Sequence, residues 1–492
     1  MSQINIANLT FAYDGSYDNI FDKVYFCIDT DWKLGFIGRN GRGKTTFLNI
    51  LLGKYEYRGT ISASVNFEYF PYEVTDKTAN TIDIICSIHS NYKQWELERE
   101  LSLLNVSQEV LYRPFLTLSN GEQTKILLAA LFLKDNGFLL IDEPTNHLDM
   151  EARETVSNYL KLKKGFILVS HDRTFLDNCI DHILSINKTN LEIQKGNFSS
   201  WWENKTQRDN FEVAENERLE KDIKRLHASA KRTSDWSDKV EKTKNEANDS
   251  GNSSDKGYIG HKAQKMMKRS KAIEERQANA IAEKSGLLRN IENSDSLKIT
   301  QLQYHMNQMV ALEDISVIYG NKTSCQNVNF TIAKGERIAL CGINGSGKSS
   351  IIKLIRGENI PYTGTLRIGS NLKISYVSQD TSFLQGNLSE YADLQNIDES
   401  LFKAILRKLG FSRVQFEKDM AEFSGGQKKK VLIARSLCEK VNLHIWDEPL
   451  NFIDVISRIQ IEELLMEYKP TILFVEHDIS FCNNVATKFV HI

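Results

Sequence analysis

The sequence predicts an α/β fold in which two tandem domains are joined by a long antiparallel α-helical hairpin. Two glycine-rich segments each follow a short apolar run, and further along each half a second apolar run ends in two acids. Equivalent positions in the two halves lie 304 to 306 residues apart, which indicates a tandem repeat. Between the halves lies a lysine-rich segment that is almost devoid of aliphatic residues.

Chain length and composition limit the number of domains and the classes of protein to which the chain can belong. A chain of 492 residues suggests two or three domains. The longest uninterrupted apolar run, Ile126 to Leu133, has eight residues, whereas a membrane span needs about twenty. The first residues do not resemble an export leader, so we expect a soluble, cytoplasmic protein with no membrane partner. The seven cysteines are scattered without a C-x-x-C pair, which argues against a disulfide framework and a zinc site.

The charge is unevenly distributed. The formal net charge is -2, but residues 221–290 hold 17 Lys and Arg against 10 Asp and Glu, a surplus of +7 that leaves -9 on the rest. A basic middle segment is therefore flanked by acidic halves.

The two glycine-rich segments, GRNGRGKT and GINGSGKS, fit the phosphate-binding pattern G-x-x-x-x-G-K-[ST], and each follows an expected strand (KLGFI, RIALC). Glycines let the loop wrap so tightly that backbone N–H groups and the next helix N-terminus converge on phosphate oxygens. Lys44 and Lys348 are expected to reach the β- and γ-phosphates, and Thr45 and Ser349 to bind Mg²⁺. The residues expected to bind nucleotide here are Gly38, Arg39, Asn40, Gly41, Arg42, Gly43, Lys44, Thr45, Thr46, Gly342, Ile343, Asn344, Gly345, Ser346, Gly347, Lys348, Ser349 and Ser350.

The apolar runs GFLLIDEP and LHIWDEP end in paired acids. Ligands of an open parallel sheet gather at the carboxyl ends of its strands, so these acids should emerge beside the phosphate loops. Asp142 and Asp447 suit Mg²⁺, and Glu143 and Glu448 suit the general base that orients an attacking water.

Two further expected strands end in GFILVSHD and TILFVEHD, which place His171 and His477 at like positions. A lone histidine at a strand end is more often structural. Because these two recur at the same offset, we assign them to the catalytic sites.

A third repeated feature is a serine, two small or polar residues and a Glu or Gln before an amphipathic stretch, at LSNGEQ and FSGGQK. Alone, each would be an ordinary helix cap. Their matching register makes Ser119, Gly121, Ser424 and Gly426 candidates for binding phosphate at a second helix N-terminus.

With these motifs in this order, the chain resembles an ATP-binding cassette (ABC) protein with two fused nucleotide-binding domains. The resemblance implies that the halves face each other head to tail within one monomer and that each ATP lies between the phosphate loop of one half and the signature serine of the other. Lys44 would then share a nucleotide with Ser424 and Gly426, and Lys348 with Ser119 and Gly121. ATP would hold the halves together, and its hydrolysis would let them part.

The branch of the family is suggested by LIDEPTNHLD, IGRNGRGKTT, the charged linker and the absence of membrane segments, which together resemble the ABC-F class. Only 75 residues separate Lys44 from Ser119 and 76 separate Lys348 from Ser424, and nothing follows the last expected strand, so we expect any special function to reside in the linker. The opening residues and the linker are similar to the Lsa-type antibiotic resistance proteins. That resemblance implies a bacterial ribosome as the partner, through large-subunit rRNA and the P-site tRNA, with no DNA, and protection against lincosamides, pleuromutilins and streptogramin A.

The two halves also differ. The second half has Gln379 where the family places a glutamine that serves nucleotide and metal, and the first half has Pro71-Tyr72 there. Asn120 replaces a signature glycine, and the second D-loop reads Asn451 to Asp454 where the first reads Asn146 to Asp149. We expect two unequal ATP sites.

The linker, 201–300, joins a first domain at 1–200 to a second at 301–492. Apolar residues at 219, 223, 226 and 230 and again from Ile273 to Ile291 form heptad seams, which predict two antiparallel helices of about thirty residues each, spanning roughly 45 Å. Residues from about 235 to 262 are expected to form the tip loop. The tip residues expected to contact the ribosome or the drug site are Trp236, Lys239, Lys242, Lys244, Lys256, Tyr258, His261 and Lys262.

The sequence alone also fits other interpretations. The basic linker also fits a solvated helical face in a flexible connector. The whole chain also fits the ATPase subunit of a drug efflux ABC transporter, or a housekeeping ABC-F translation factor.

Overall fold

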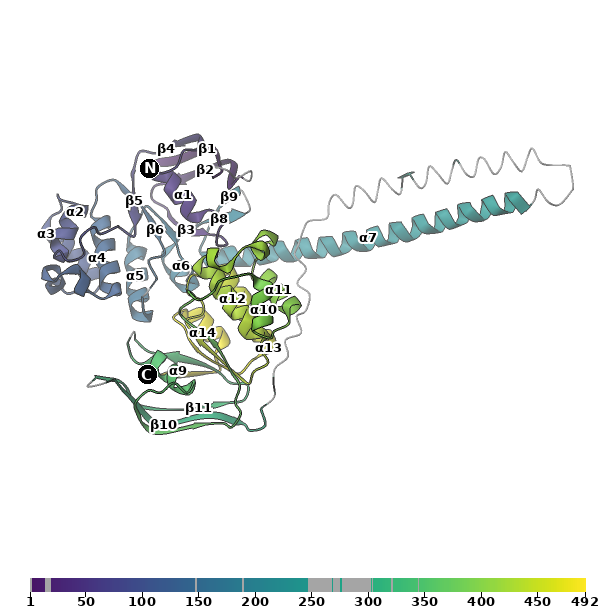
Figure 1. Cartoon of the computed structure of the whole chain (residues 1–492). Coiled ribbons are helices and arrows are strands. Elements are labelled where there is room, and N and C mark those ends of the chain that lie inside the picture. The colour runs from purple at the N-terminus through teal and green to yellow at the C-terminus, as the bar shows by residue number, and fades with distance from the viewer. Residues whose placement is uncertain are drawn as a thin grey trace. The chain divides into compact units, whose positions relative to one another are not determined.

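The computed structural model describes residues 2–13, 19–146, 148–187, 190–246, 268, 275–276, 302, 304–319, 322–343 and 345–492. Its contacts divide the chain into two compact units: Met1–Trp201 with Ser296–Ile492, and Trp202–Asp295. The first unit holds both halves of the repeat, which we call cassette 1 (before residue 201) and cassette 2 (after residue 300) (Figure 1).

Each cassette has an antiparallel sheet and a mainly parallel one. In cassette 1 the antiparallel order is β2-β1-β4 and the larger sheet runs β5-β6-β7-β3-β8-β9, in which only β9 is antiparallel to its neighbour. The strands are β1 (Gln3–Phe11), β2 (Phe21–Asp29), β3 (Lys33–Ile37), β4 (Arg58–Ser62), β5 (Asn66–Phe70), β6 (Gly137–Asp142), β7 (Phe166–Val169), β8 (His182–Asn187) and β9 (Asn190–Lys195).

Cassette 2 repeats this plan, which confirms the predicted tandem α/β fold. Its sheets have the orders β11-β10-β13 and β14-β15-β16-β12-β17. The strands are β10 (Gln308–Tyr319), β11 (Lys322–Ala333), β12 (Arg337–Cys341), β13 (Tyr362–Ile368), β14 (Ile374–Val377), β15 (Leu443–Asp447), β16 (Ile472–Val475) and β17 (Lys488–His491).

The helices follow the strands in the same order in both cassettes. Cassette 1 has α1 (Lys44–Leu51), α2 (Thr81–Ile88), α3 (Gln94–Leu103), α4 (Asn120–Phe132), α5 (Met150–Leu162) and α6 (Arg173–Cys179). Cassette 2 has α9 (Lys348–Ile355), α10 (Leu388–Leu394), α11 (Glu399–Lys408), α12 (Gly425–Cys438), α13 (Val455–Tyr468) and α14 (Ile479–Val485). Short 3₁₀ turns are η1 (Gln108–Tyr112), η2 (Phe115–Thr117), η3 (Arg413–Glu417) and η4 (Met420–Glu422). In cassette 1, α2 and α3 pack on α4 to form a helical group beside the larger sheet (Figure 1).

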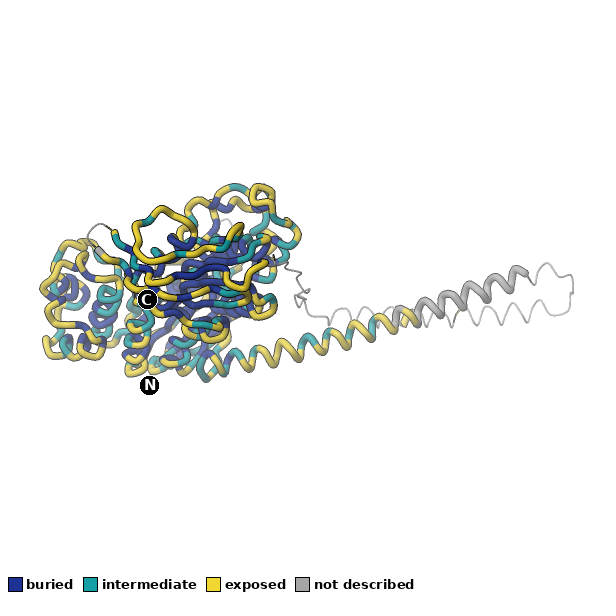
Figure 2. Tube along the Cα trace, turned by 90° about the horizontal axis from the view of Figure 1, so that it is seen from below, coloured by how far each residue is buried: buried dark blue, intermediate teal, exposed yellow. Residues whose placement is uncertain are grey.

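The parallel strands form the core and fix the site. Strands β7 and β16 are buried along their whole length, as expected for parallel strands covered on both faces. Figure 2 shows this buried interior surrounded by more exposed elements. Because parallel strands end at one edge, the acids after β6 and β15 and the histidines after β7 and β16 emerge on the same side as the phosphate loops after β3 and β12.

The linker begins as a single long helix, α7 (Phe198–Glu246). Its described surface is largely exposed (Figure 2), with Leu219 and Ile223 of the expected seam half-buried. The expectation of a tip loop from about 235 is wrong for its first part, since residues 235–246 are helical. The sequence from 235 to 246 has neither glycine nor proline, so it contains no residue that would interrupt the helix up to Glu246.

Candidate nucleotide-binding sites

The two phosphate loops have the same local geometry. Gly43 and Gly347 precede α1 and α9 with φ of 98° and 99°, a left-handed conformation that favours glycine. Lys44 Nζ donates to the Gly38 carbonyl at 2.8 Å, and Lys348 Nζ donates to the Gly342 carbonyl at the same distance. Burial lowers the pKa of both lysines. Each lysine is thus enclosed by its own loop, where an incoming anion would meet it.

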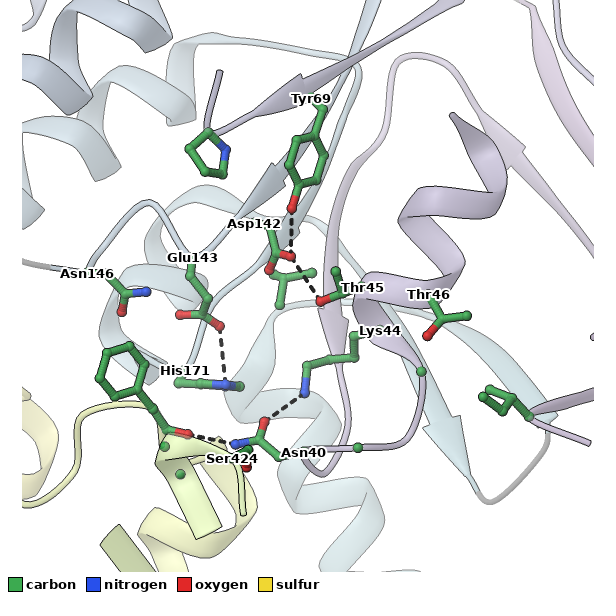
Figure 3. Close-up of a pocket in the computed structure, with 18 of the residues that line it drawn as sticks. Asn40, Lys44, Thr45, Thr46, Tyr69, Asp142, Glu143, Asn146, His171 and Ser424 are labelled. Atoms are coloured by element: carbon green, nitrogen blue, oxygen red, sulfur yellow. Dashed lines mark hydrogen bonds and ion pairs between the residues drawn. The ribbon is translucent and has the colours of Figure 1, made fainter. Parts of the chain in front are cut away.

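Site 1 is a cavity of about 860 Å³ lined by residues of both cassettes. Asn40 Nδ2 donates to the Phe452 carbonyl of cassette 2 at 2.7 Å, which ties the first phosphate loop to the second D-loop (Figure 3). The lining residues include Tyr13, Asn40, Gly41, Gly43, Lys44, Thr45, Thr46, Tyr69, Asp142, Glu143, Asn146 and His171 from cassette 1, and Ser424, Gly425, Gly426 and Phe452 from cassette 2.

Site 2 is a cavity of about 670 Å³ that is also lined by residues of both cassettes. It is lined by Ser119, Asn120, Gly121, Glu122, Lys125, Leu148, Asp149 and Arg153 among others from cassette 1, and by Gly345, Gln379, Glu448, Asn451 and His477 from cassette 2. The structure therefore brings each signature serine to the opposite cassette's catalytic candidates.

Oxygen ligands gather at the end of β6. Thr45 Oγ1 and Tyr69 Oη both donate to Asp142 Oδ2 at 3.1 Å (Figure 3). Burial raises the pKa of Asp142, and burial followed by the charge of Asp142 raises the pKa of Tyr69, so the phenol keeps its proton. In cassette 2, Asp447 Oδ1 is buried without a hydrogen-bond partner among the described residues. Such hydroxyl and carboxylate oxygens fit Mg²⁺, which prefers hard oxygen donors.

Glu143 and Glu448 have the same backbone geometry, with φ of 51° and 47°, but unlike surroundings. The His171 Nε2 atom lies 3.2 Å from Glu143 Oε1 (Figure 3). Burial, followed by the charge of Asp142, raises the pKa of Glu143 to about 8. Burial, followed by the charge of Lys44, lowers the pKa of His171, so this imidazole is neutral.

Glu448 is surrounded by donors. Gln379 Nε2 and Asn451 Nδ2 donate to Glu448 Oε2 at 2.6 and 2.7 Å, and His477 Nε2 lies 3.7 Å from Oε1. Burial acts to raise the pKa of Glu448, but contacts with His477, Asn451 and Gln379 outweigh it and bring the pKa to about 2. The two candidate bases therefore differ in their protonation at neutral pH.

The signature segments are helix N-caps. Ser119 Oγ accepts from the Glu122 N–H at 3.2 Å, and Ser424 Oγ accepts from the Gln427 N–H at 3.4 Å, each completing a capping box. A side chain at Gly426 would place its Cβ 2.3 Å from the Phe452 carbonyl oxygen. The glycine is required for this close approach of the D-loop.

Several predicted nucleotide ligands lie away from the cavities. Gly38 and Arg42 do not line site 1, and the Arg39 guanidinium lies against Gly410 of cassette 2. Ile343 is 64% exposed, and Asn344 lies outside the described residues. The residues Gly342, Ser346, Gly347, Lys348, Ser349 and Ser350 do not line site 2. Lys348 nevertheless interacts electrostatically with Glu448 and Asp149 of that site, and Ser349 hydrogen-bonds Asp447.

The residues at these sites that were not predicted from the sequence include Tyr69, Lys429, Asn451 and Phe452. Aligning the repeats would have marked Tyr69, because Tyr376 occupies the equivalent strand position. Lys429 Nζ donates to the carbonyls of Ser378 and Glu448 at 2.9 and 3.0 Å, and no local pattern predicts that contact.

The cassettes also meet beside the sites. Arg173 on α6 forms a double hydrogen bond with Glu462 on α13, and Asn484 Nδ2 donates to the same carboxylate at 3.2 Å. Thr174 and Ser480, equivalent positions of the repeat, lie 2.8 Å apart through their hydroxyl oxygens. These contacts make cassette 1 and cassette 2 a continuous packed unit.

The predicted linker contacts divide into two groups. Trp236, Lys239, Lys242 and Lys244 fall on α7. Lys256, Tyr258, His261 and Lys262 lie outside the described residues. Among the residues that the structure describes, no helix is long and apolar enough to cross a membrane.

Comparison with known proteins places this geometry in context. The family model described as "ABC transporter" matches residues 21–146 and 325–451. The ATP-binding protein Uup of Buchnera aphidicola (subsp. Acyrthosiphon pisum, strain APS) is 28% identical, over 99% of this chain and 80% of that protein. The ribosome protection protein VmlR of Bacillus subtilis (strain 168) is also 28% identical, over 97% of this chain and 84% of the relative.

Solved structures show the same fold. An archaeal ribosome recycling factor, aABCE1, in complex with the ribosomal stalk protein aP1, superposes with a TM-score of 0.62 at 19% identity, covering 98% of this chain and 87% of that one. A structure titled "RNase-L Inhibitor" gives the same TM-score at 18% identity, covering 99% and 87%.

Proposed function

The chain belongs to the ABC transporter family and carries that family's ATP-binding domain twice, and from this premise we propose that it is an ATP-driven ribosome protection factor. It is an ATPase, and its relatives over nearly the full length are ABC-F type ATP-binding proteins. The observation that carries the proposal is that both cavities are built from the two cassettes together, in a chain whose connecting segment is basic.

ATP would bind in each cavity against one phosphate loop and the opposite signature helix. Lys44 and the N-terminus of α1 face the phosphates at site 1, and Ser424 with the N-terminus of α12 approaches from the other cassette. Binding energy is gained only when both halves are in place, so ATP favours the closed arrangement. Loss of the γ-phosphate removes that preference.

The metal and the bases have separate positions. Thr45 and Asp142 would hold Mg²⁺ at site 1, and Ser349, Gln379 and Asp447 at site 2. When bound, Mg²⁺ neutralises charge on the phosphates. Glu143 and Glu448 orient water for attack, and His171 and His477 lie beside them.

The partner is proposed to be the bacterial ribosome. VmlR is by name a ribosome protection protein, and the surplus of positive charge between residues 221 and 290 suits rRNA phosphates. We propose that the linker enters the tRNA exit site and that its far end acts through rRNA and the P-site tRNA on the peptidyl transferase centre. There it would dislodge lincosamides, pleuromutilins or streptogramin A.

Shortening the linker tests this role. Because α7 is helical to Glu246, the deletion should start after it and remove residues 248–261, joined by a short glycine-serine turn. We expect resistance to disappear while ATPase activity of the purified chain is unchanged. The matched control replaces the same residues with a glycine-serine segment of equal length, which separates length from chemistry. Resistance retained in the shortened variant would contradict the assignment.

The partner is tested by trapping the closed state. A Glu143→Gln, Glu448→Gln double variant should bind ATP without hydrolysing it and co-sediment with ribosomes. Co-sedimentation with membranes instead would support an efflux ATPase. Ribosome binding without any change in drug susceptibility of the host strain would support a housekeeping translation factor.

A further inference from the structure

The two cassettes differ in sequence at the strand end beside the proposed metal position. In site 1 a tyrosine hydroxyl lies at this position. Gln379 of cassette 2 donates to Glu448, but the equivalent position of cassette 1 is Tyr72. The side chain of Tyr72 lines a different cavity, beside α4, and does not line site 1. Site 1 therefore receives no amide from this strand end.

The backbone pairing of the strands explains why the Tyr69 side chain reaches Asp142. Tyr69 pairs with Leu140, two residues before Asp142, so both side chains leave the same face of the parallel sheet. Its hydroxyl donates to Asp142 Oδ2, the same oxygen that accepts from Thr45 (Figure 3). Two donors on one carboxylate oxygen restrict the rotation of that carboxylate.

The equivalent tyrosine of cassette 2 is engaged elsewhere. Tyr376 pairs with Ile445, two residues before Asp447, but the Arg356 guanidinium lies 3.7 Å from the centre of its ring. Arg356 follows α9, and the same position after α1 is Leu52. Leu52 offers no cation to the ring of Tyr69, and the Lys54 ammonium lies 5.4 Å from the ring centre, farther than Arg356 lies from the ring of Tyr376. The Tyr69 hydroxyl is therefore free to reach Asp142.

We propose that Tyr69 is a positioning residue of site 1, which holds the Asp142 carboxylate in the orientation that receives the metal of the bound nucleotide. The inference rests on the ATP-binding part of the proposed function. Partners that orient a metal-binding carboxylate in this way typically change metal affinity by about 10–100-fold when they are removed. The role is specific to site 1, because in cassette 2 the Arg356 guanidinium lies on the ring of Tyr376, and Gln379 donates to Glu448.

The test measures nucleotide affinity with and without metal. In a Lys348→Ala background, which disables site 2, the dissociation constant of a fluorescent ATP analogue is measured in Mg²⁺ and in EDTA. Tyr69→Phe removes only the hydroxyl, and we expect it to reduce the gain in affinity on adding Mg²⁺ by about tenfold. The affinity in EDTA should be unchanged, whereas a purely structural role would weaken both.

Two further variants complete the design. Leu52→Arg supplies the cation that cassette 2 uses, so it should draw the Tyr69 ring away and reproduce the loss even if Tyr69→Phe folds poorly. Tyr376→Phe in a Lys44→Ala background is the matched control and should leave the Mg²⁺ dependence of site 2 unchanged.

An unchanged Mg²⁺ dependence in Tyr69→Phe and Leu52→Arg, or an equal loss in Tyr376→Phe, would overturn the proposal. The measurements use the chain alone, so a failure to bind ribosomes would leave this result intact and would count only against the proposed partner.

Discussion

Two glutamates at equivalent positions of the repeat have opposite electrostatic surroundings. Glu143 is enclosed near Asp142 and lies beside a neutral imidazole, whereas Glu448 accepts hydrogen bonds from Gln379 and Asn451. Burial determines the direction of the pKa shift of Glu143, whereas hydrogen-bond donors determine that of Glu448. A base must be ionised to take a proton, so the two sites should respond differently to pH.

With its pKa near 8, Glu143 is mostly protonated at pH 7 and ionised at pH 9. In a Glu448→Gln variant, where site 1 alone turns over, we expect kcat/KM for ATP to rise about tenfold between pH 7 and 9. In a Glu143→Gln variant, kcat/KM should stay flat, because Glu448 with its pKa near 2 is ionised throughout. Steady-state profiles of both variants check this, and parallel profiles would contradict it.

The two signature glycines, Gly426 and Gly121, should also differ in how well they tolerate a side chain. A Cβ at Gly426 would lie 2.3 Å from the Phe452 carbonyl oxygen and 2.9 Å from the Asn40 amide nitrogen, but a Cβ at Gly121 meets only Leu148 at 3.6 Å. We expect Gly426→Ala to hinder the close approach of the cassettes and so to reduce ATP affinity at site 1 at least tenfold. The control Gly121→Ala should have little effect. ATP affinity at each site, measured with the other phosphate-loop lysine replaced, distinguishes the two. A stronger effect of Gly121→Ala would be inconsistent with this packing.

At the scale of elements, helix α12 links two strand ends of cassette 2. Lys429 is almost fully buried, and its ammonium bonds the carbonyls of Ser378, which precedes Gln379, and of Glu448. The equivalent residue of α4 is Thr124, which is too short to act in the same way. One side chain therefore fixes the positions of both the glutamine and the candidate base of site 2.

Replacing this ammonium should affect one site. Lys429→Met keeps the length of the side chain but leaves two carbonyls unpaired, at a cost of about 1–3 kcal/mol each. We expect turnover at site 2 to fall more than tenfold in a Glu143→Gln background. Turnover at site 1 in a Glu448→Gln background should change less than twofold. Thr124→Val serves as the control in α4, and equal losses at both sites would argue against a local role.

The elements themselves were largely predictable, because apolar runs followed by glycine or acids mark buried parallel strands. The strands before Gly38, Gly342 and Glu143 occur where the sequence predicts them. The extension of α7 to Glu246 was missed because the seam residues end at 230, although a charged sequence without helix breakers continues the helix. Tyr69 was missed because its role depends on whether position 52 or 356 carries a cation, which a local pattern does not report.

At the scale of the whole molecule, the repeat offset predicted two equivalent halves and the family resemblance implied that they face each other, but neither indicated how they differ at their contact. Arg173 and Glu462 form a buried pair 289 residues apart in sequence, and their equivalents are Ile479 and Ser157. Neither equivalent is charged, so this link exists on one side only. Pairing between distant residues has no signature in a single sequence.

Breaking that pair should destabilise the closed unit on the side of site 1. Removing one partner of a buried ion pair costs about 3–5 kcal/mol, so Arg173→Gln should lower the closed fraction with ATP. The exchange Arg173→Glu with Glu462→Arg should recover part of it, and Ile479→Gln should have little effect. Energy transfer between dyes on the two cassettes, in the Glu143→Gln, Glu448→Gln background, measures closure. No loss in Arg173→Gln would exclude a clamping role.

The hydroxyls of Thr174 and Ser480 contact each other although they occupy the same position of the two repeats, so a local dyad passes between them. In a homodimer every substitution near such a dyad appears twice. Fusion of the two copies into one polypeptide removes that constraint, and each half accumulates changes that its counterpart does not share. The charged pair between Arg173 and Glu462, and the hydrogen bond from Tyr69 to Asp142, are differences of this kind, each present in one half of the repeat among the described residues.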